Sequence, residues 1–206
     1  MTAFQQYSEA GQDVFAYKVL LEGREPYEGT FLDIGCADPM HNNNTYAFVK
    51  GFGWKGVMVD YQNWGGKIRE HRPCAFVHAD MRSGNWYQRV KEAGLDVSKP
   101  IDYLSFDLDD ATVQVIEAFP FHEARFRVIT IEHDKYRFGQ EAQDRIHAVL
   151  TRHGYEAICT NINIREGFPF EDWYVHPDLV DIDRARQMKC DGMVWKDAVA
   201  MFGPCV

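Results

Sequence analysis

The sequence contains few cysteines, and their spacing argues against two common ways of stabilising a small fold. The five cysteines are odd in number and widely scattered along the 206 residues, at Cys36, Cys74, Cys159, Cys190 and Cys205. Disulfide frameworks and zinc sites usually place cysteines in pairs at short spacing. We therefore expect free thiols in the reducing environment of the cytoplasm.

Basic clusters and long apolar runs are also missing. The 22 Lys and Arg residues face 31 Asp and Glu residues, which gives a formal net charge of −9. This balance provides no phosphate-tracking surface, so no nucleic-acid partner is expected. No apolar run approaches the roughly 20 residues that span a bilayer, and residues 1–12 lack the features of a secretory signal. The sequence predicts a soluble, cytoplasmic protein without a membrane partner.

Linkers rich in proline and serine, internal repeats and low-complexity tracts are absent as well. With 46% apolar residues, a chain of this length can bury one sizeable core. We therefore expect one domain over residues 1–206. Residues 1–25 would form an N-terminal helical lid, and residues 190–206 a C-terminal tail without a recognisable pattern.

Apolar, β-prone runs alternate with polar segments of helical spacing over most of the chain. This alternation is typical of α/β folds. Strands are expected at 30–34, 56–60, 74–78, 101–107 and 126–132, and helices at 44–51, 64–71, 83–93 and 111–118. Ser83 and Asp110 are expected to cap helix starts, and Gly51 and Gly94 to end helices.

Further elements are expected before and after this alternating region. Residues 140–153 show helical spacing of apolar residues and end at Gly154. Residues 155–161 and 171–175 flank a loop with Gly and Pro, which predicts an antiparallel C-terminal β-hairpin. Residues 8–21 indicate a capped amphipathic helix. Five parallel strands and the hairpin would give a seven-stranded sheet with helices on both faces.

The segment TFLDIGCADP (30–39) is the most informative stretch of the chain. The first predicted strand ends next to Asp33, and a tight turn of small residues follows at Gly35, Cys36 and Ala37. Small residues let the backbone approach a ligand closely. We interpret the turn as a candidate cofactor cradle, although an ordinary strand-to-helix turn has the same appearance.

Acidic residues end or follow each of the five predicted parallel strands: Asp33, Asp60, Asp80, Asp107 and Glu132. In a parallel sheet these ends lie on one edge, where such folds bind ligands. Several carboxylates can be desolvated together only if donors or cations meet them. A ligand with hydroxyl groups, an amine and a positive charge would supply these partners, and S-adenosylmethionine has all three.

Three of these acids have candidate roles toward such a ligand. Asp60 is suited to accept from the ribose hydroxyls, and Asp80 from the adenine amino group. Asp33 could hold the ammonium end, and the predicted site includes Tyr61 and Met81, which follow Asp60 and Asp80. The alternatives are a solvent-facing strand end for Asp60 and a helix cap before Ser83 for Asp80.

Several blocks together resemble a known family. They are YSEAGQD (7–13), LDIGCADP (32–39), NNNTY (42–46), GWKGVMVDY (53–61) and IDYLSFDLDD (101–110). The chain resembles the class I S-adenosylmethionine-dependent methyltransferases and, within them, the FkbM-type O-methyltransferases, over about two thirds of its length in the family's order. The resemblance implies a Rossmann-like seven-stranded sheet, S-adenosylmethionine as cofactor, and O-methylation of a sugar, a glycan or another small metabolite.

The chain departs from the family pattern at three places. Ala37 and Pro39 stand where the family's turn usually carries glycines, and proline removes a backbone donor. Asp109 and Asp110 stand where many relatives show Glu-Gly. A catalytically degenerate binding protein of the same fold is therefore an alternative. A nicotinamide-dependent oxidoreductase is a weaker one, because Ala37 and Met40 break the G-x-G-x-x-G pattern.

Two acidic clusters are candidates for the chemistry. Asp107, Asp109 and Asp110 follow the fourth predicted strand, and Glu132, His133 and Asp134 end the fifth. Neighbouring strands lie about 5 Å apart, so these side chains could meet at one substrate hydroxyl or one divalent cation such as Mg²⁺. We predict His133 as the base, with Asp107 and Glu132 orienting it or the acceptor. A surface histidine bonded to Asp134 is the alternative.

Overall fold

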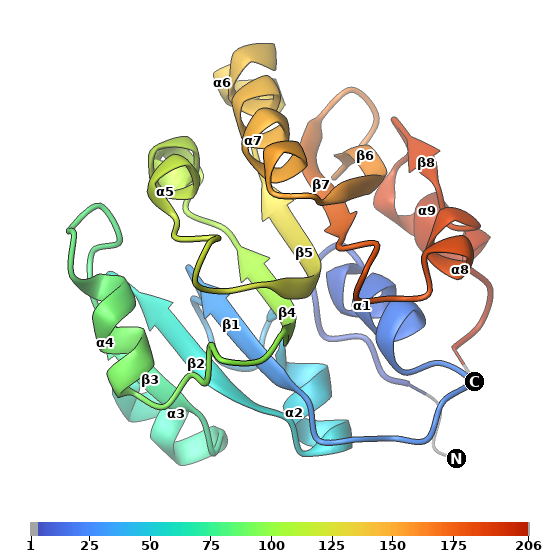
Figure 1. Cartoon of the computed structure of the whole chain (residues 1–206). Helices are drawn as coiled ribbons and strands as arrows, with labels where there is room; N and C mark the ends of the chain where they lie inside the picture. Colours follow the sequence, from blue (N-terminus) through green and yellow to red (C-terminus); the bar gives the residue numbers. More distant parts are fainter. Residues whose placement is uncertain (1–3, 206) are drawn as a thin grey trace.

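An eight-stranded mixed sheet runs through the part of the protein that the computed structural model describes, residues 4–205 (Figure 1). The strand order across the sheet is β3-β2-β1-β4-β5-β7-β6-β8. The strands are β1 (Thr30–Ile34), β2 (Lys55–Asp60), β3 (Ala75–His78), β4 (Ile101–Phe106), β5 (Phe126–Glu132), β6 (Glu156–Asn163), β7 (Pro169–Val175) and β8 (Cys190–Asp191). Strands β1 to β5 are parallel, and β7 is antiparallel to both β5 and β6. The predicted C-terminal hairpin is therefore confirmed.

The predicted number of seven strands is wrong because of β8, which lies in the segment expected to be a patternless tail. Cys190 and Asp191 pair in parallel with Cys159 and Thr160 of β6. A strand of two residues has no periodicity that a sequence pattern could reveal. The tail also contains the short helix α9 (Trp195–Met201), and another short helix, α8 (Ile182–Arg186), precedes it.

Helices cover both faces of the sheet and enclose two apolar cores. One core packs α4 (Trp86–Glu92), α5 (Thr112–Ala118) and α7 (Gln140–Arg152) against Leu32, Leu104 and Ile129. The other core packs α1 (Gln12–Leu20), α2 (Tyr46–Phe52), α3 (Gly65–His71), α8 and α9 against Phe31, Tyr103 and Val128 (Figure 1). Because the central strands are buried on both faces, they are continuous apolar runs.

Helix ends differ in detail from the predictions. Gly94 and Gly154 follow their helices with φ of +106° and +85°, as left-handed C-terminal residues do. Gly51 lies inside α2, which ends at Gly53 instead. Ser83 donates to the carbonyl of Asp80 rather than capping α4, and Asp110 lies inside the short 3₁₀ helix Asp109–Ala111. The predictions that Ser83 and Asp110 cap helices are therefore wrong.

Helix α1 is shorter than the predicted segment 8–21 and is not amphipathic, because all of its residues are buried. Phe15 stacks on Trp173 of β7 with the ring centres 5.1 Å apart, and Phe202 lies 6.2 Å from Phe15. The helix is thus packed between the sheet and the C-terminal segment, and its role as a lid stays a prediction. Among residues 4–205, no helix has the length and apolar character needed to cross a bilayer.

Candidate active site

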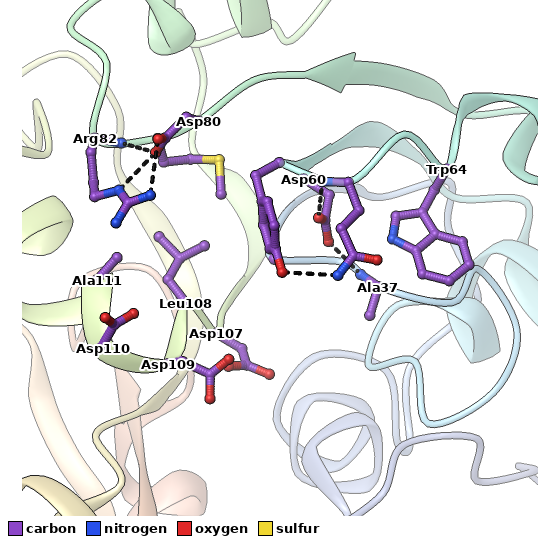
Figure 2. A pocket seen from close by; sticks show the side chains of 14 residues that line it. Ala37, Asp60, Trp64, Asp80, Arg82, Asp107, Leu108, Asp109, Asp110 and Ala111 are labelled. Atoms are coloured by element: carbon purple, nitrogen blue, oxygen red, sulfur yellow. Dashed lines mark hydrogen bonds and ion pairs between the residues drawn. The ribbon is translucent and has the colours of Figure 1, made fainter.

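A cavity of about 400 Å³ opens at the carboxyl ends of the parallel strands (Figure 2). Seven of the predicted site residues line it: Gly35, Ala37, Asp60, Tyr61, Asp80, Met81 and Asp107. They come from the ends of β1, β2, β3 and β4, where the sequence placed them. The prediction that ligand-binding residues gather at the ends of the parallel strands therefore agrees with the position of the cavity.

Gly35 brings the ends of β1 and β4 into direct contact. Its φ is +77°, and a Cβ built on it would lie 1.5 Å from the carbonyl oxygen of Asp107. Asp107 N–H donates to Ile34 O at 2.9 Å, and Gly35 N–H donates to Val59 O at 2.9 Å. Only glycine fits this position, because the neighbouring backbone occupies the place of a side chain.

Two backbone N–H groups, from the loops that follow β1 and β2, hold the carboxylate of Asp60 at the cavity wall. Its carboxylate accepts from Ala37 N–H at 2.9 Å and from Gln62 N–H at 2.7 Å. Ala37 has a φ of +45°, in the region that glycine adopts without strain, which explains why a glycine suits this position. The side chain of Asp60 is a rigid acceptor on the cavity wall, as expected for a group that holds a diol.

Asp80 lies at the rim of the cavity with its side chain about half exposed. Arg82 donates to its carboxylate from Nε and Nη2, both at 3.0 Å, and these bonds lower the pKa of Asp80 (Figure 2). Helix α4 begins only at Trp86, so Asp80 is not its cap. Asp80 and Met81 both line the cavity, and Figure 2 shows Asp80 across it from Asp107.

Two predicted cofactor residues, Asp33 and Cys36, do not line the cavity. Asp33 is buried beneath the loop after β1, where Thr45 Oγ1 donates to it at 2.7 Å and Asn43 Nδ2 at 3.4 Å. Burial raises the pKa of Asp33, while nearby Arg72 opposes this. Cys36 is also buried, which raises the pKa of its thiol. The Asp33 side chain thus holds the loop in place, and Cys36 packs in the core.

Pro39 also lies outside the cavity lining. The turn around it is organised by Asp38, whose carboxylate accepts from the N–H groups of Met40 at 3.0 Å and His41 at 3.1 Å. The missing N–H of Pro39 therefore removes no donor from the cavity wall.

Three carboxyl groups form a row across β4, β5 and β7, which we call the acid row: Asp107, Glu132 and Glu171. Glu132 and Glu171 are direct ladder partners, and Asp107 follows Phe106, the partner of Ile131. Burial and then Asp109 raise the pKa of Asp107 to about 7, and burial and then Asp107 raise the pKa of Glu132 well above its usual range. The carboxyl groups of Asp107 and Glu132 are hydrogen-bonded, so one of them carries a proton.

Sequence reasoning missed Glu171, because the segment EDWYV was recognised only as a strand. Its place beside Glu132 follows only from the pairing of β5 with β7. Within residues 4–205, no group of His, Cys, Asp and Glu is arranged to hold a metal ion. The expected Mg²⁺ site therefore finds no support in the arrangement of these side chains.

His133 lies away from the cavity and is fully buried. Its Nε2 is 3.2 Å from Asp172 Oδ1, and its Nδ1 accepts from Lys135 N–H at 3.1 Å. Both ring nitrogens are engaged, so neither can take a proton from a ligand in the cavity. The partner of His133 is Asp172 and not Asp134, because the ring turns toward β7. The arrangement does not support His133 as the base.

Because buried acids have raised pKa values, we expect the free energy of unfolding to increase as the pH is lowered from 7.5 to 5.5. The pKa of Asp13 is raised by burial from 3.8 to about 6, so the folded state binds this proton more tightly than the unfolded state. The stability is present below the unfolded pKa and is lost as the pH rises through the folded pKa. A shift of about 2 units corresponds to about 3 kcal/mol for Asp13 alone.

Urea unfolding at the two pH values measures this effect. The lowered pKa values of His153 and His176 act in the opposite direction but stem from partly buried rings. An increase of about 1 kcal/mol at pH 5.5 is expected from Asp13, because the rest of its contribution develops only between about pH 5.5 and the unfolded pKa of 3.8. Asp13→Asn should flatten the dependence. A stability that rises with pH over this range would contradict the assignment.

No protein-family model matches the chain. No curated protein sequence matches it either. Solved structures do resemble it at low sequence identity. A protein of the DUF574 family from Streptomyces avermitilis is 14% identical, with a TM-score of 0.52 over 81% of this chain and 80% of the other. A candidate rRNA methylase from Clostridium thermocellum is 14% identical, with a TM-score of 0.52 over 83% and 97% of the two chains.

A third structure, DesVI from Streptomyces venezuelae, is 10% identical, with a TM-score of 0.50 over 84% of this chain and 93% of the other. Similarity at these identities concerns the fold alone. The protein therefore has an α/β fold similar to that of these solved structures, with a mostly parallel central sheet and helices on both faces.

Proposed function

We propose that the protein is an S-adenosylmethionine-dependent O-methyltransferase that acts on a hydroxyl of a sugar, a glycan or another small metabolite in the cytoplasm. The cavity at the ends of β1 to β4 is the observation that carries this proposal. Its volume of about 400 Å³ falls within the range of about 300 to 1,000 Å³ usual for small-molecule sites. The motifs that resemble FkbM-type enzymes support assignment to that subfamily.

The lining residues fit the cofactor group by group. Asp60 would accept from the two ribose hydroxyls, since its carboxylate is held rigidly by Ala37 and Gln62. Asp80 and Met81 would contact the adenine at the rim. Gly35 leaves the backbone of β1 bare at the cavity floor. When bound, S-adenosylmethionine supplies an electrophilic methyl group.

Asp107 replaces His133 as the candidate base. It lines the cavity, and its pKa of about 7 suits a group that takes a hydroxyl proton near neutral pH. Glu132 is hydrogen-bonded to Asp107 and would orient it. Positioning of the acceptor against the methyl donor, with water excluded, would supply most of the remaining rate enhancement.

The alternative of a catalytically degenerate binding protein depended on Pro39. Because Pro39 lies outside the cavity, it gives no reason to expect lost cofactor binding. Nothing in the cavity favours a nicotinamide cofactor over a methyl donor. Mass spectrometry of the protein as isolated distinguishes these candidate functions, since a methyltransferase is expected to carry some S-adenosylhomocysteine.

Replacing Asp60 with alanine is expected to weaken S-adenosylhomocysteine binding at least about 100-fold, because two hydrogen bonds to a charged group contribute roughly 1.5 to 3 kcal/mol each. Equilibrium dialysis with labelled ligand measures the affinity. Asp60→Asn, which keeps one acceptor oxygen for the backbone, should show a smaller loss. Asp183→Ala, on an exposed residue of α8, is the matched control. Equal affinities in wild type and Asp60→Ala would remove Asp60 from the site.

A further inference from the structure

The acid row shares one face of the sheet with a row of polar side chains and a row of apolar ones, and the one acid in the polar row has a cationic neighbour. Two residues along each strand from the acid row, and so on the same face, lie the ladder neighbours Asp33, Ser105, Thr130 and Trp173. Asp33 has Arg72, Thr45 and Asn43 around it, and Asn44 donates to Ser105 at 3.0 Å. Below these polar residues the face is apolar.

No lysine, arginine or histidine among the described residues forms an ion pair with a member of the acid row. The charges that face Asp107 and Glu132 are themselves acidic, from Asp109 and Asp134. Arg137 pairs with Asp109 and Asp134 at 3.0 and 3.1 Å. It forms no ion pair with a carboxyl group of the acid row. The row therefore has no cationic partner, and burial raises the pKa of all three of its carboxyl groups.

Glu171 adds an independent observation. Its side chain is 1% exposed, and its Oε2 has no hydrogen-bond partner. Burial raises the pKa of Glu171 well above its usual range, and the nearby side chains of Trp173 and Gln12 oppose this only in part. A buried acceptor left without a partner costs about 1 to 3 kcal/mol. Such a group is better explained by a ligand donor than by folding alone.

The acid row is also accessible from the cavity. Asp107 is part of the cavity lining, and both Asp107 and Glu132 are partly exposed. Because adjacent strands are about 4.8 Å apart, Glu132 lies one strand and Glu171 two strands beyond Asp107, at about 5 and 10 Å from this wall of the cavity. The row thus runs from the wall of the cavity to a buried, unpartnered end.

We propose that the methyl acceptor carries a protonated amino group, which Glu132 and Glu171 bind, while Asp107 faces the hydroxyl that is methylated. This inference rests on the proposed function and names its substrate class: hydroxylated amines, such as amino sugars or amino alcohols. The donors of an ammonium group match the unpartnered oxygen of Glu171, and its charge offsets the clustered carboxylates. The ammonium of the cofactor has the same chemistry and is distinguished by experiment.

The test uses the full chain saturated with S-adenosylhomocysteine, whose own binding is measured first. The probes are a panel of amino sugars and amino alcohols, each with its N-acetylated partner, beginning with glucosamine and N-acetylglucosamine. Saturation-transfer NMR and calorimetry measure binding. At least one amine is expected to bind ten-fold or more tightly than its N-acetylated partner. Its binding should release a proton at pH 7, seen as heat that depends on the buffer.

Glu171→Gln should abolish the preference for the amine and leave the affinity for S-adenosylhomocysteine within about two-fold. Glu166→Gln, on an exposed residue between β6 and β7, should change neither. If Glu171→Gln fails to fold, Glu132→Gln serves the same purpose. The proposal is overturned if no amine in the panel is preferred, or if the preference survives in these variants.

A third outcome assigns the cation to the cofactor. Weaker S-adenosylhomocysteine binding in Glu171→Gln would mean that the row holds the ammonium of the cofactor, and the proposal about the acceptor would be wrong. Failure of the wild type to bind S-adenosylhomocysteine contradicts the proposed function itself. The two failures are therefore distinguishable.

Discussion

Gly35→Ala is expected to lower the free energy of unfolding by at least about 4 kcal/mol, or to prevent folding. The new Cβ would lie 1.5 Å from the carbonyl oxygen of Asp107, so the ends of β1 and β4 would have to separate. The φ of +77° adds a further penalty of about 1 to 2 kcal/mol for any residue with a side chain. Urea unfolding followed by circular dichroism measures the change.

Gly51→Ala is the matched control. A Cβ at Gly51 meets nothing within 4 Å, and the residue lies inside α2 with an ordinary φ. Alanine in a helix is more favourable than glycine by about 0.5 to 1 kcal/mol, so a small gain is expected. A Gly35→Ala protein as stable as Gly51→Ala would show that β1 and β4 are not in contact at the cavity floor.

Asp107→Asn is expected to reduce turnover by about 10² to 10⁴, because asparagine cannot take the hydroxyl proton. The affinity for S-adenosylhomocysteine should change only a few-fold, since the side chain keeps its size and its place in the cavity wall. In the wild type, the rate should rise with pH through about 7, where Asp107 loses its proton. This dependence should be absent in Asp107→Asn. Single-turnover rates across pH 5.5 to 8.5 provide the measurement.

His133→Ala separates the two candidate bases. Loss of the buried ring leaves the carboxylate of Asp172 without one of its donors, so a loss of stability is expected. The rise of the rate through about pH 7 should persist in this variant, because Asp107 is unchanged. If the rise disappears in His133→Ala and persists in Asp107→Asn, the base is His133 and the assignment made here is wrong.

The parallel half of the sheet could be predicted closely from the sequence. The expected strands at 30–34 and 126–132 match β1 and β5, and the one at 56–60 starts one residue after β2. Buried parallel strands are continuous apolar runs that stop at a polar residue, which is a local signal. The two-residue β8 has no such signal, because its pairing depends on β6, about 30 residues earlier.

The site could be predicted only where local position determined it. Asp60 and Asp107 line the cavity because each follows directly from the end of a parallel strand. The burial of Asp33 depends on Thr45, Asn43 and Arg72, which fold over it from elsewhere in the chain. No pattern within one strand reveals such contacts.

The alternation of side chains along a strand explains why Glu132, and not His133, lies beside Asp107 at the end of β5. Side chains at successive strand positions point to opposite faces of the sheet. Glu132 therefore joins the acid row, and the ring of His133 turns away to Asp172. Which residue faces the ligand depends on the register with β7, and this register is a long-range property of the fold.

The central claim is that the cavity at the ends of β1 to β4 binds S-adenosylmethionine. Isothermal titration of the purified wild-type chain with S-adenosylhomocysteine tests it most directly, because this product binds without reacting. The account predicts saturable heat with one site per chain and a matching rise in the melting temperature. No heat and no thermal shift with either S-adenosylhomocysteine or S-adenosylmethionine would contradict it.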